Sequence, residues 1–285
     1  MSDTPFCQCP VVPGPPRFVR GNTERERMPT VVVEQAADVA ILLADRISAT
    51  IARCVFEKGR CVLGLASGRT PIGIYRELVR RHVTGDLDFS RVATFNLDEY
   101  YPIDPANRRS YRYYMEENLF RHVNIDPSNA HIPDGSVHRD DVGGLCAAYE
   151  EMIRAAGGID FQILGIGRTG HIGFNEPGST PGSRTRLIML DAITRCDAAS
   201  DFPDEVSVPA EAITMGIATI LEAREIALIA TGEHKADIVR RAIEEEPTAE
   251  VTASFLQGHA GTTAWLDRAA AGRLTRLRLA DEGPG

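Results

Sequence analysis

The residues most suited to chemistry lie in the sequence LGIGRTGHIGFNEPGS at positions 164–179, where an apolar run ends in a glycine-rich turn. The turn contains Gly165 and Gly167, and it is followed by His171 and Glu176. Glycine allows positive φ and a close approach of the backbone to a ligand. Histidine titrates near neutral pH and transfers protons, and a neighbouring carboxylate orients its ring. The segment predicts an enzyme that moves protons on a small polar substrate.

The same glycines also match a nucleotide-binding spacing. Gly165, Gly167 and Gly170 form the pattern GxGxxG, which is the fingerprint of dinucleotide-binding proteins when a helix begins within it. Residues 172–181 show no helical pattern. We therefore reject a dinucleotide site here.

A second segment with chemical potential follows the apolar run at 61–66. Its residues are Ser67, Gly68, Arg69 and Thr70, and a helical pattern begins directly afterwards. The free N–H groups and the dipole of a helix N-terminus both favour an anion. The segment predicts either a phosphate-binding loop or a capped helix start without a ligand.

Two further apolar runs end in charged residues. Asp98 and Glu99 come after the run at 92–95, and Lys235 comes after the run at 226–230. Adjacent side chains of an extended chain point in opposite directions, so we expect only one of the two carboxylates to face a site. Lys235 can reach a phosphate as a point charge. Taken singly, these residues are more typical of solvated loop acids and of an exposed helix lysine.

The elements that position these segments alternate between apolar runs and amphipathic stretches. Apolar strands that alternate with helices predict an α/β fold, with a parallel sheet covered on both faces. Ligands of such sheets bind beyond the carboxyl ends of the strands, where all four polar segments lie. We expect strands at 31–33, 61–66, 92–95, 161–164, 226–230, 253–256 and 262–266, and helices at 36–56, 72–82, 111–121, 142–156, 213–221 and 236–243.

Composition excludes several classes of partner. The chain has 285 residues, a net charge of −9 and no extended basic run, which argues against nucleic acid. It contains no apolar run long enough to cross a membrane. Residues 1–29 are rich in proline and charge and are expected to form a disordered leader. A single domain is expected over residues 30–280.

The cysteines indicate structural thiols. They form neither a CxxC pair nor a cluster with histidine, so we expect no metal site. Cys54, Cys61 and Cys146 lie among apolar residues and are expected to be buried. A reducing cytoplasm fits this usage best.

Residues 30–270 resemble the glucosamine-6-phosphate deaminases, also called isomerases. The segments that carry the resemblance include LGLASGRTPIGIY, TFNLDEYY, LGIGRTGHIGFNEPGS and TGEHKA, in the order typical of that family. The related 6-phosphogluconolactonases lack the FNEPGS continuation. The resemblance implies a modified Rossmann-like, three-layer α/β/α fold with a mostly parallel sheet. It also implies no metal or organic cofactor and a homo-oligomer, either a trimer or a hexamer.

The resemblance also implies the chemistry and the residues that perform it. The family opens the ring of glucosamine 6-phosphate, isomerises it and releases ammonia to give fructose 6-phosphate. Asp98 would take the proton from C2 and deliver it to C1, while His171 would assist ring opening with Glu176 orienting it. The residues implied to hold the phosphate or to form the floor of the sugar site are Ser67, Gly68, Thr70, Gly165, Gly167 and Lys235.

Three positions near this site depart from the family pattern. Thr169 stands where members usually have Asp or Asn, and it can hydrogen-bond to the catalytic group but carries no charge. Ser200 stands where many members have a phosphate-binding arginine, and Arg69 replaces a glycine of the phosphate loop. We hypothesise that Arg69 supplies the charge that Ser200 lacks.

A possible regulatory site departs as well. Ser179 and Arg186 match positions where some members bind an allosteric activator, N-acetylglucosamine 6-phosphate. Ile188 stands where that site has a lysine, which argues against activation. Arg186 is equally compatible with a structural ion pair.

The departures leave other functions open. The same chemistry on another amino-sugar phosphate, such as galactosamine 6-phosphate, is one alternative. A sugar-phosphate-binding protein without catalysis is another, and the presence of Asp98, His171, Glu176 and Lys235 argues against it. Hydrolysis of a phosphosugar lactone is the weakest.

Overall fold

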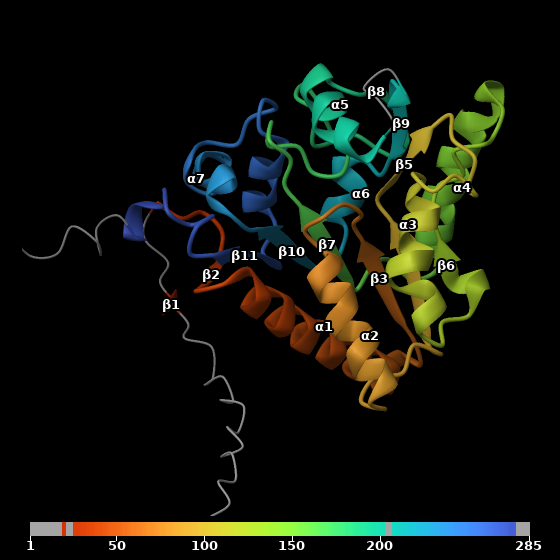
Figure 1. Ribbon diagram of the computed structural model, residues 1–285, viewed down its shortest axis with the longest axis horizontal. Coiled ribbons are helices and arrows are strands. Elements are labelled where there is room, and N and C mark those ends of the chain that lie inside the picture. The colour runs from red at the N-terminus through yellow and green to blue at the C-terminus, as the bar shows by residue number, and fades with distance from the viewer. Residues whose placement is uncertain (1–18, 21–24, 203–206, 278–285) are drawn as a thin grey trace, which may run out of the picture.

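A twisted eight-stranded sheet forms the centre of the protein (Figure 1). The computed structural model describes residues 19–20, 25–202 and 207–277. The strand order is β1-β2-β11-β10-β7-β3-β4-β6. The strands are β1 (Val19–Arg20), β2 (Thr30–Val33), β3 (Cys61–Leu65), β4 (Val92–Asn96), β6 (Ala130–His131), β7 (Phe161–Gly165), β10 (Glu225–Ala230) and β11 (Thr262–Asp267).

The sheet is parallel except at one edge. β1 pairs antiparallel with β2, and the remaining pairs from β2 to β6 run parallel. Every residue of β3 and β4 is buried, which explains why these strands are apolar without alternation. The predicted mostly parallel α/β sheet is confirmed.

Helices cover both faces of this sheet. The chain runs from β2 to β3 to β4 in one direction along the sheet and from β7 to β10 to β11 in the other. Right-handed crossovers therefore place the first helices on one face and the later ones on the opposite face, and α1 and α2 lie side by side (Figure 1). The helices of these crossovers are α1 (Ala36–Lys58), α2 (Ile72–Val83), α4 (Val142–Ala155), α6 (Ile217–Leu221) and α7 (Ala236–Glu244).

The longest helix shows how the sequence determines these elements. α1 buries Val39, Leu43, Ile47 and Ile51, which recur at the spacing of one helix face. It ends at Gly59, whose φ of 79° is the left-handed conformation that closes many helices. This buried face packs against the central sheet and holds α1 in place.

A second, smaller sheet was not predicted. It is antiparallel and has the order β5-β9-β8. Residues 213–221 were expected to be one helix, but the helix begins only after Gly216, where a side chain would collide with the carbonyl oxygen of Ser183. The strands are β5 (Asp98–Tyr101), β8 (Arg186–Met189) and β9 (Glu211–Thr214), and the neighbouring helices are α3 (Tyr111–Asn118) and α5 (Ala192–Ala198).

The expected strand at 253–256 is also wrong. Thr252–Gly258 forms a 3₁₀ helix whose Ala253 and Leu256 are fully buried. A short apolar run does not distinguish a buried strand from a buried helical turn.

The folded domain begins before residue 30. Residues 1–18 and 21–24 of the expected leader lie outside the described residues, as do residues 278–280 at the other end of the expected domain. Val19–Arg20 pairs with β2, and Met28 is only 1% exposed. Glu26 is also buried and forms an ion pair with Arg276, with 3.1 Å between Nε and Oε1. In the described part of the chain, every helix is too short or too polar to cross a lipid bilayer.

Candidate active site

A cavity lies where two neighbouring strands send the chain in opposite directions. From β3 the chain continues toward β4, and from the adjacent β7 it continues toward β10. Such a switch point is the usual ligand site of an open α/β sheet. The cavity measures ≈ 170 Å³, and eight predicted site residues line it: Ser67, Gly68, Arg69, Thr70, Asp98, Gly165, Gly167 and His171.

Asp98 is a buried carboxylate with little compensation. It is 5% exposed, and it accepts one hydrogen bond, from the Ser67 hydroxyl, at 3.3 Å. Burial raises the pKa of Asp98 to about 7, the nearby charge of Glu99 also raises it, and the Ser67 hydrogen bond lowers it. A carboxylate with this pKa can take up and return a proton near neutral pH.

Glu99 points away from the cavity, as the alternation along an extended chain predicts. Its carboxylate accepts hydrogen bonds from the backbone N–H groups of Tyr111, at 2.8 Å, and Arg112, at 2.9 Å. These groups belong to the first turn of α3. Of the two acids, Asp98 lines the cavity and Glu99 caps the neighbouring helix.

His171 is oriented by groups that converge on one ring nitrogen. Its Nδ1 lies 2.9 Å from Thr169 Oγ1, 3.3 Å from Glu176 Oε2 and 3.5 Å from Thr194 Oγ1. Because a carboxylate accepts only, we assign the proton of the neutral ring to Nδ1. The lone pair of Nε2 is then available to accept a proton.

Glu176 acts on His171 from behind the cavity wall. Burial works to raise the pKa of Glu176, but hydrogen bonds with His171 and Thr194 and the charge of His171 outweigh it, so the pKa is lowered. The group is therefore an anion that stabilises a protonated imidazole. Thr169 makes the neutral contact that its residue type predicts.

Gly167 makes room for this imidazole. A Cβ at this position would lie 2.1 Å from both Nε2 and Cε1 of His171. Gly170, with φ 88°, supplies the turn that brings the ring back over the strand end. Gly167 and Gly170 thus make room for the His171 ring and shape the turn that carries it, and they do not form a nucleotide-binding loop.

Arg69 and Ser200, the two phosphate-site departures, contact each other. Arg69 Nη2 donates to Ser200 Oγ at 2.6 Å, and Arg69 also lines the cavity. The guanidinium of Arg69 thus lies beside Ser200, whose own side chain carries no charge. The loop is shaped at Gly68, whose φ is 91°.

Lys235 lies behind the cavity and does not line it. Its Nζ donates to the carbonyl oxygen of Ile166 at 2.8 Å, and Ile166 is a lining residue. Burial lowers the pKa of Lys235. To reach a phosphate, the ammonium group has to exchange this hydrogen bond for a ligand oxygen.

Sequence reasoning missed two contributors, Tyr111 and Thr194. Tyr111 lines the cavity, donates a hydrogen bond to the Tyr100 hydroxyl at 3.3 Å and stacks on Phe174 at 5.9 Å between ring centres. Its one local signal is Ser110, which caps α3. Thr194 contacts His171 from a different segment, and no pattern in the chain marks it.

The possible regulatory residues are brought together outside the cavity. Arg186 donates from Nη2 to Ser179 Oγ and from Nη1 to Asn175 Oδ1, both at 2.9 Å. Burial lowers the pKa of Arg186. Ile188 follows on the same strand, β8, without a charge.

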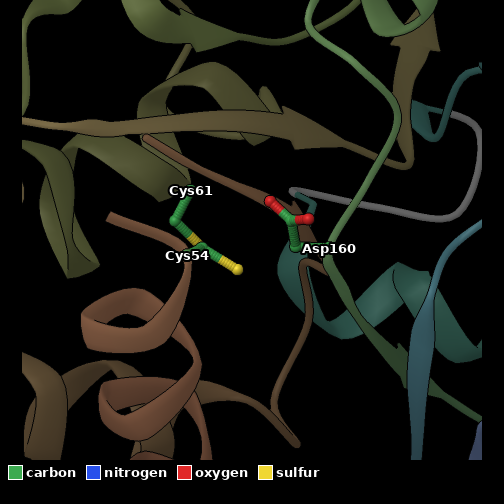
Figure 2. A group of neighbouring side chains, drawn as sticks. All are labelled: Cys54, Cys61 and Asp160. Carbon is green, nitrogen blue, oxygen red and sulfur yellow. The ribbon is translucent and has the colours of Figure 1, made fainter. Parts of the chain in front are cut away.

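A cluster of metal-ligand types lies at the opposite end of the sheet. Cys54, Cys61 and Asp160 place their ligand atoms within 4.8 Å of one another (Figure 2). The Asp160 carboxylate already accepts from Lys58 at 2.6 Å, Arg224 at 3.0 Å and one backbone N–H. Burial raises the pKa of both thiols, so they remain protonated. Two cations and two neutral thiols do not suit a metal ion, and the cluster is structural.

Comparison with known proteins decides the family. A family model described as glucosamine-6-phosphate isomerases/6-phosphogluconolactonase matches residues 34–265. The chain belongs to this family. "Glucosamine-6-phosphate deaminase 2" of Giardia intestinalis is 47% identical over 253 residues, which cover 88% of this chain and 93% of that protein. The glucosamine-6-phosphate deaminase of Arthrobacter sp. (strain FB24) is 46% identical over 254 residues, 89% of this chain and 94% of its own.

Solved structures of the family share the fold. A structure described as a monomeric glucosamine-6-phosphate deaminase has a TM-score of 0.82 and 40% identity, covering 86% of this chain and 100% of its own. The 6-phosphogluconolactonase of Thermotoga maritima has a TM-score of 0.67 and 21% identity over 84% of this chain and 98% of its own. The second likeness concerns the fold alone.

Proposed function

We propose that the chain converts glucosamine 6-phosphate and water into fructose 6-phosphate and ammonia. The observation that carries this proposal is one cavity that holds two proton-transfer groups beside an anion loop. One group is Asp98, with a pKa of about 7, and the other is the His171–Glu176 pair. The relatives at 46–47% identity that bear the deaminase name support it.

The first step in the proposed reaction opens the sugar ring. His171 Nε2 takes the proton of the C1 hydroxyl and passes it to the ring oxygen as the bond between C1 and the ring oxygen breaks, and Glu176 stabilises the imidazolium that forms in between. Thr169 holds the ring through Nδ1 without adding charge. The open-chain aldehyde is the substrate for the next step.

Asp98 then performs the isomerisation. Its carboxylate removes the C2 proton to give an enolamine, and the resulting acid returns that proton to C1. Water adds at C2, and the amine leaves as ammonia. A carboxyl pKa near neutrality suits both directions of this transfer, since the group must be a base and then an acid.

The phosphate is assigned to the loop after β3. Ser67, Gly68 and Thr70 surround it at the start of α2, where unpaired N–H groups and the helix dipole favour an anion. Arg69 supplies a guanidinium on the Ser200 side, and Lys235 supplies a second cation. Gly165 and Gly167 form the floor under the sugar.

The direct test is ammonia release from a panel of amino-sugar 6-phosphates. We expect turnover of glucosamine 6-phosphate with fructose 6-phosphate as the second product. Faster turnover of galactosamine 6-phosphate would assign a different substrate to the same reaction. Tight binding without ammonia would indicate a binding protein, and acid release from a phosphosugar lactone would indicate a hydrolase.

Assembly and location complete the proposal. We infer a homo-oligomer in the cytoplasm, from the family resemblance and from the cysteine usage, although the solved relative at 40% identity is described as monomeric. Light scattering separates a trimer or hexamer from a single chain of 31.1 kDa. We assign no cofactor to the reaction, because acid–base groups supply each step.

A further inference from the structure

We propose that Glu99 is a positioning residue for the reaction: it fixes Asp98 and Tyr111 at the cavity, and its negative charge acts on the Asp98 carboxylate. The inference rests on the proposed function for the role of Asp98. Nothing in the local sequence marks Glu99 as more than the neighbour of a candidate base.

Glu99 ties two separate elements together. It lies in β5, is 1% exposed and uses both carboxylate oxygens. Oε1 accepts from the N–H groups of Tyr100, at 2.9 Å, and Tyr111, at 2.8 Å, and Oε2 accepts from the N–H of Arg112, at 2.9 Å. Together with the Ser110 hydroxyl, this carboxylate caps the first turn of α3, where the helix dipole also favours a negative charge.

This cap fixes the position of Tyr111, which forms part of the cavity wall. Tyr111 is held through its backbone by Glu99, and its side chain lines the same cavity as Asp98. Asp98 is held through the strand that it shares with Glu99, opposite Thr214 of β9. Moving the Glu99 carboxylate would therefore shift both residues relative to each other.

The electrostatic coupling follows from the surroundings. Asp98 accepts a hydrogen bond from Ser67 and is close enough to Tyr75, Tyr111 and Tyr149 to interact with them electrostatically, and none of these groups is a cation. Arg69 and His171 line the same cavity. The adjacent charge of Glu99 opposes the ionisation of Asp98.

The pKa of Glu99 is itself close to neutral pH. Burial raises its pKa to about 7, against the three backbone hydrogen bonds and the charge of Arg112, which lower it. Arg112 is the cation that lowers the pKa of Glu99. Ionisation of either acid thus makes ionisation of the other harder.

The test is the pH profile of kcat/KM for ammonia release. Glu99→Gln removes the charge and leaves one oxygen for the helix cap. Without the negative neighbour, Asp98 ionises more easily, so its active base form persists to lower pH. We expect the acid limb to move down by roughly half to one pH unit. An acid limb at the wild-type position in folded Glu99→Gln would overturn the proposal.

A matched control separates charge from structural damage. Glu150 is a half-buried acid that, like the fully buried Glu99, ties segments together, accepting from the backbone N–H of Thr185 at 2.8 Å and from the hydroxyl of Thr219 at 2.6 Å. It does not line the cavity. Glu150→Gln is expected to cost stability and to leave the acid limb unchanged. A shift of the same size in this control would overturn the proposal.

Two further measurements cover the remaining outcomes. If Glu99→Gln does not fold, Glu99→Asp keeps the charge and shortens the reach to α3. We expect a wild-type acid limb with kcat at least tenfold lower, and a wild-type kcat would refute the positioning role. If wild-type protein releases no ammonia, the proposed function fails. A ¹³C NMR titration of aspartate carboxyls, with Asp98→Asn for assignment, then tests whether Glu99→Gln lowers the pKa of Asp98.

Discussion

Two carboxylates are buried at opposite ends of the sheet, and they differ in how far their partners compensate the charge. Asp98 lies beyond the carboxyl end of β4, and Asp160 lies directly before the amino end of β7. They are 5% and 1% exposed. Asp160 has Lys58, Arg224 and a backbone N–H as partners, whereas the contact of Asp98 is one serine hydroxyl at 3.3 Å. The fold compensates one charge and leaves the other nearly uncompensated.

The difference separates a structural acid from a reactive one. A buried charge that is paired and fully hydrogen-bonded is held in place by its partners. A buried carboxyl without a cation has its pKa raised toward neutrality, where it exchanges protons. Burial alone therefore does not mark function; Asp98 differs from Asp160 in having one hydroxyl partner where Asp160 has two cations and a backbone N–H. Cys54 and Cys61, beside Asp160, are of a residue type that can bind a metal ion, but their buried, protonated thiols contribute to packing instead.

The largest expected effect comes from Asp98→Asn. The amide keeps the size of the side chain and cannot accept the C2 proton, so kcat for ammonia release should fall by about 10²–10⁴. Asp160→Asn serves as the matched control and should retain wild-type kcat per folded molecule. Comparable losses in both variants would remove the distinction between the two acids.

Stability should change in opposite directions in the same two variants. Asp160→Asn leaves two partly exposed cations without their carboxylate and should cost about 2–3 kcal/mol of unfolding free energy. The raised pKa of Asp98 means that between about pH 4 and pH 7 the native state holds a proton that the unfolded chain has lost. Asp98 thus destabilises the native state as pH rises. Asp98→Asn should raise Tm at pH 8 by roughly 2–4 °C in calorimetry, and a lowered Tm would contradict this account.

A smaller effect is expected at Arg69, which lines the same cavity without a role in proton transfer. Arg69→Ala removes a guanidinium from the phosphate loop, so KM should rise about tenfold while kcat changes little. The control is Arg76→Ala, because Arg76 is an exposed arginine of α2 outside the cavity. An unchanged KM in Arg69→Ala would show that Arg69 does not supply the phosphate-binding charge that Ser200 lacks.

Much of the cavity could be predicted because its parts are local motifs. The strand ends that carry Ser67, Asp98 and His171 are short apolar runs followed by polar or glycine residues, and parallel strands bring such ends to one edge. Residue type alone links Arg69 to Ser200, and the two side chains are in contact. The common physical reason is that each signal lies within a few residues of the element that positions it.

The parts that could not be predicted depend on contacts between distant segments. β5 pairs with β9 across more than one hundred residues, and the 211–214 strand is decided by its partners β5 and β8 and not by its own helical spacing. Tyr111 reaches the cavity, and Thr194 reaches His171, from segments with no chemical motif. The cap that Glu99 provides is likewise visible only once β5 and α3 are adjacent.

The most direct test of the role of Asp98 is hydrogen exchange at C1 of fructose 6-phosphate in D₂O that contains ammonium, followed by ¹H NMR. Ammonium is needed because the proposed enolamine forms from the iminium at C2. The exchange then requires removal of a C1 proton and neither ring opening nor ring closure, so it isolates the transfer assigned to Asp98. We predict that the wild-type protein and Asp160→Asn exchange one C1 hydrogen, and that Asp98→Asn at the same concentration of folded protein exchanges none. Exchange by Asp98→Asn at a rate near that of the wild type would contradict the claim that the uncompensated carboxylate is the base.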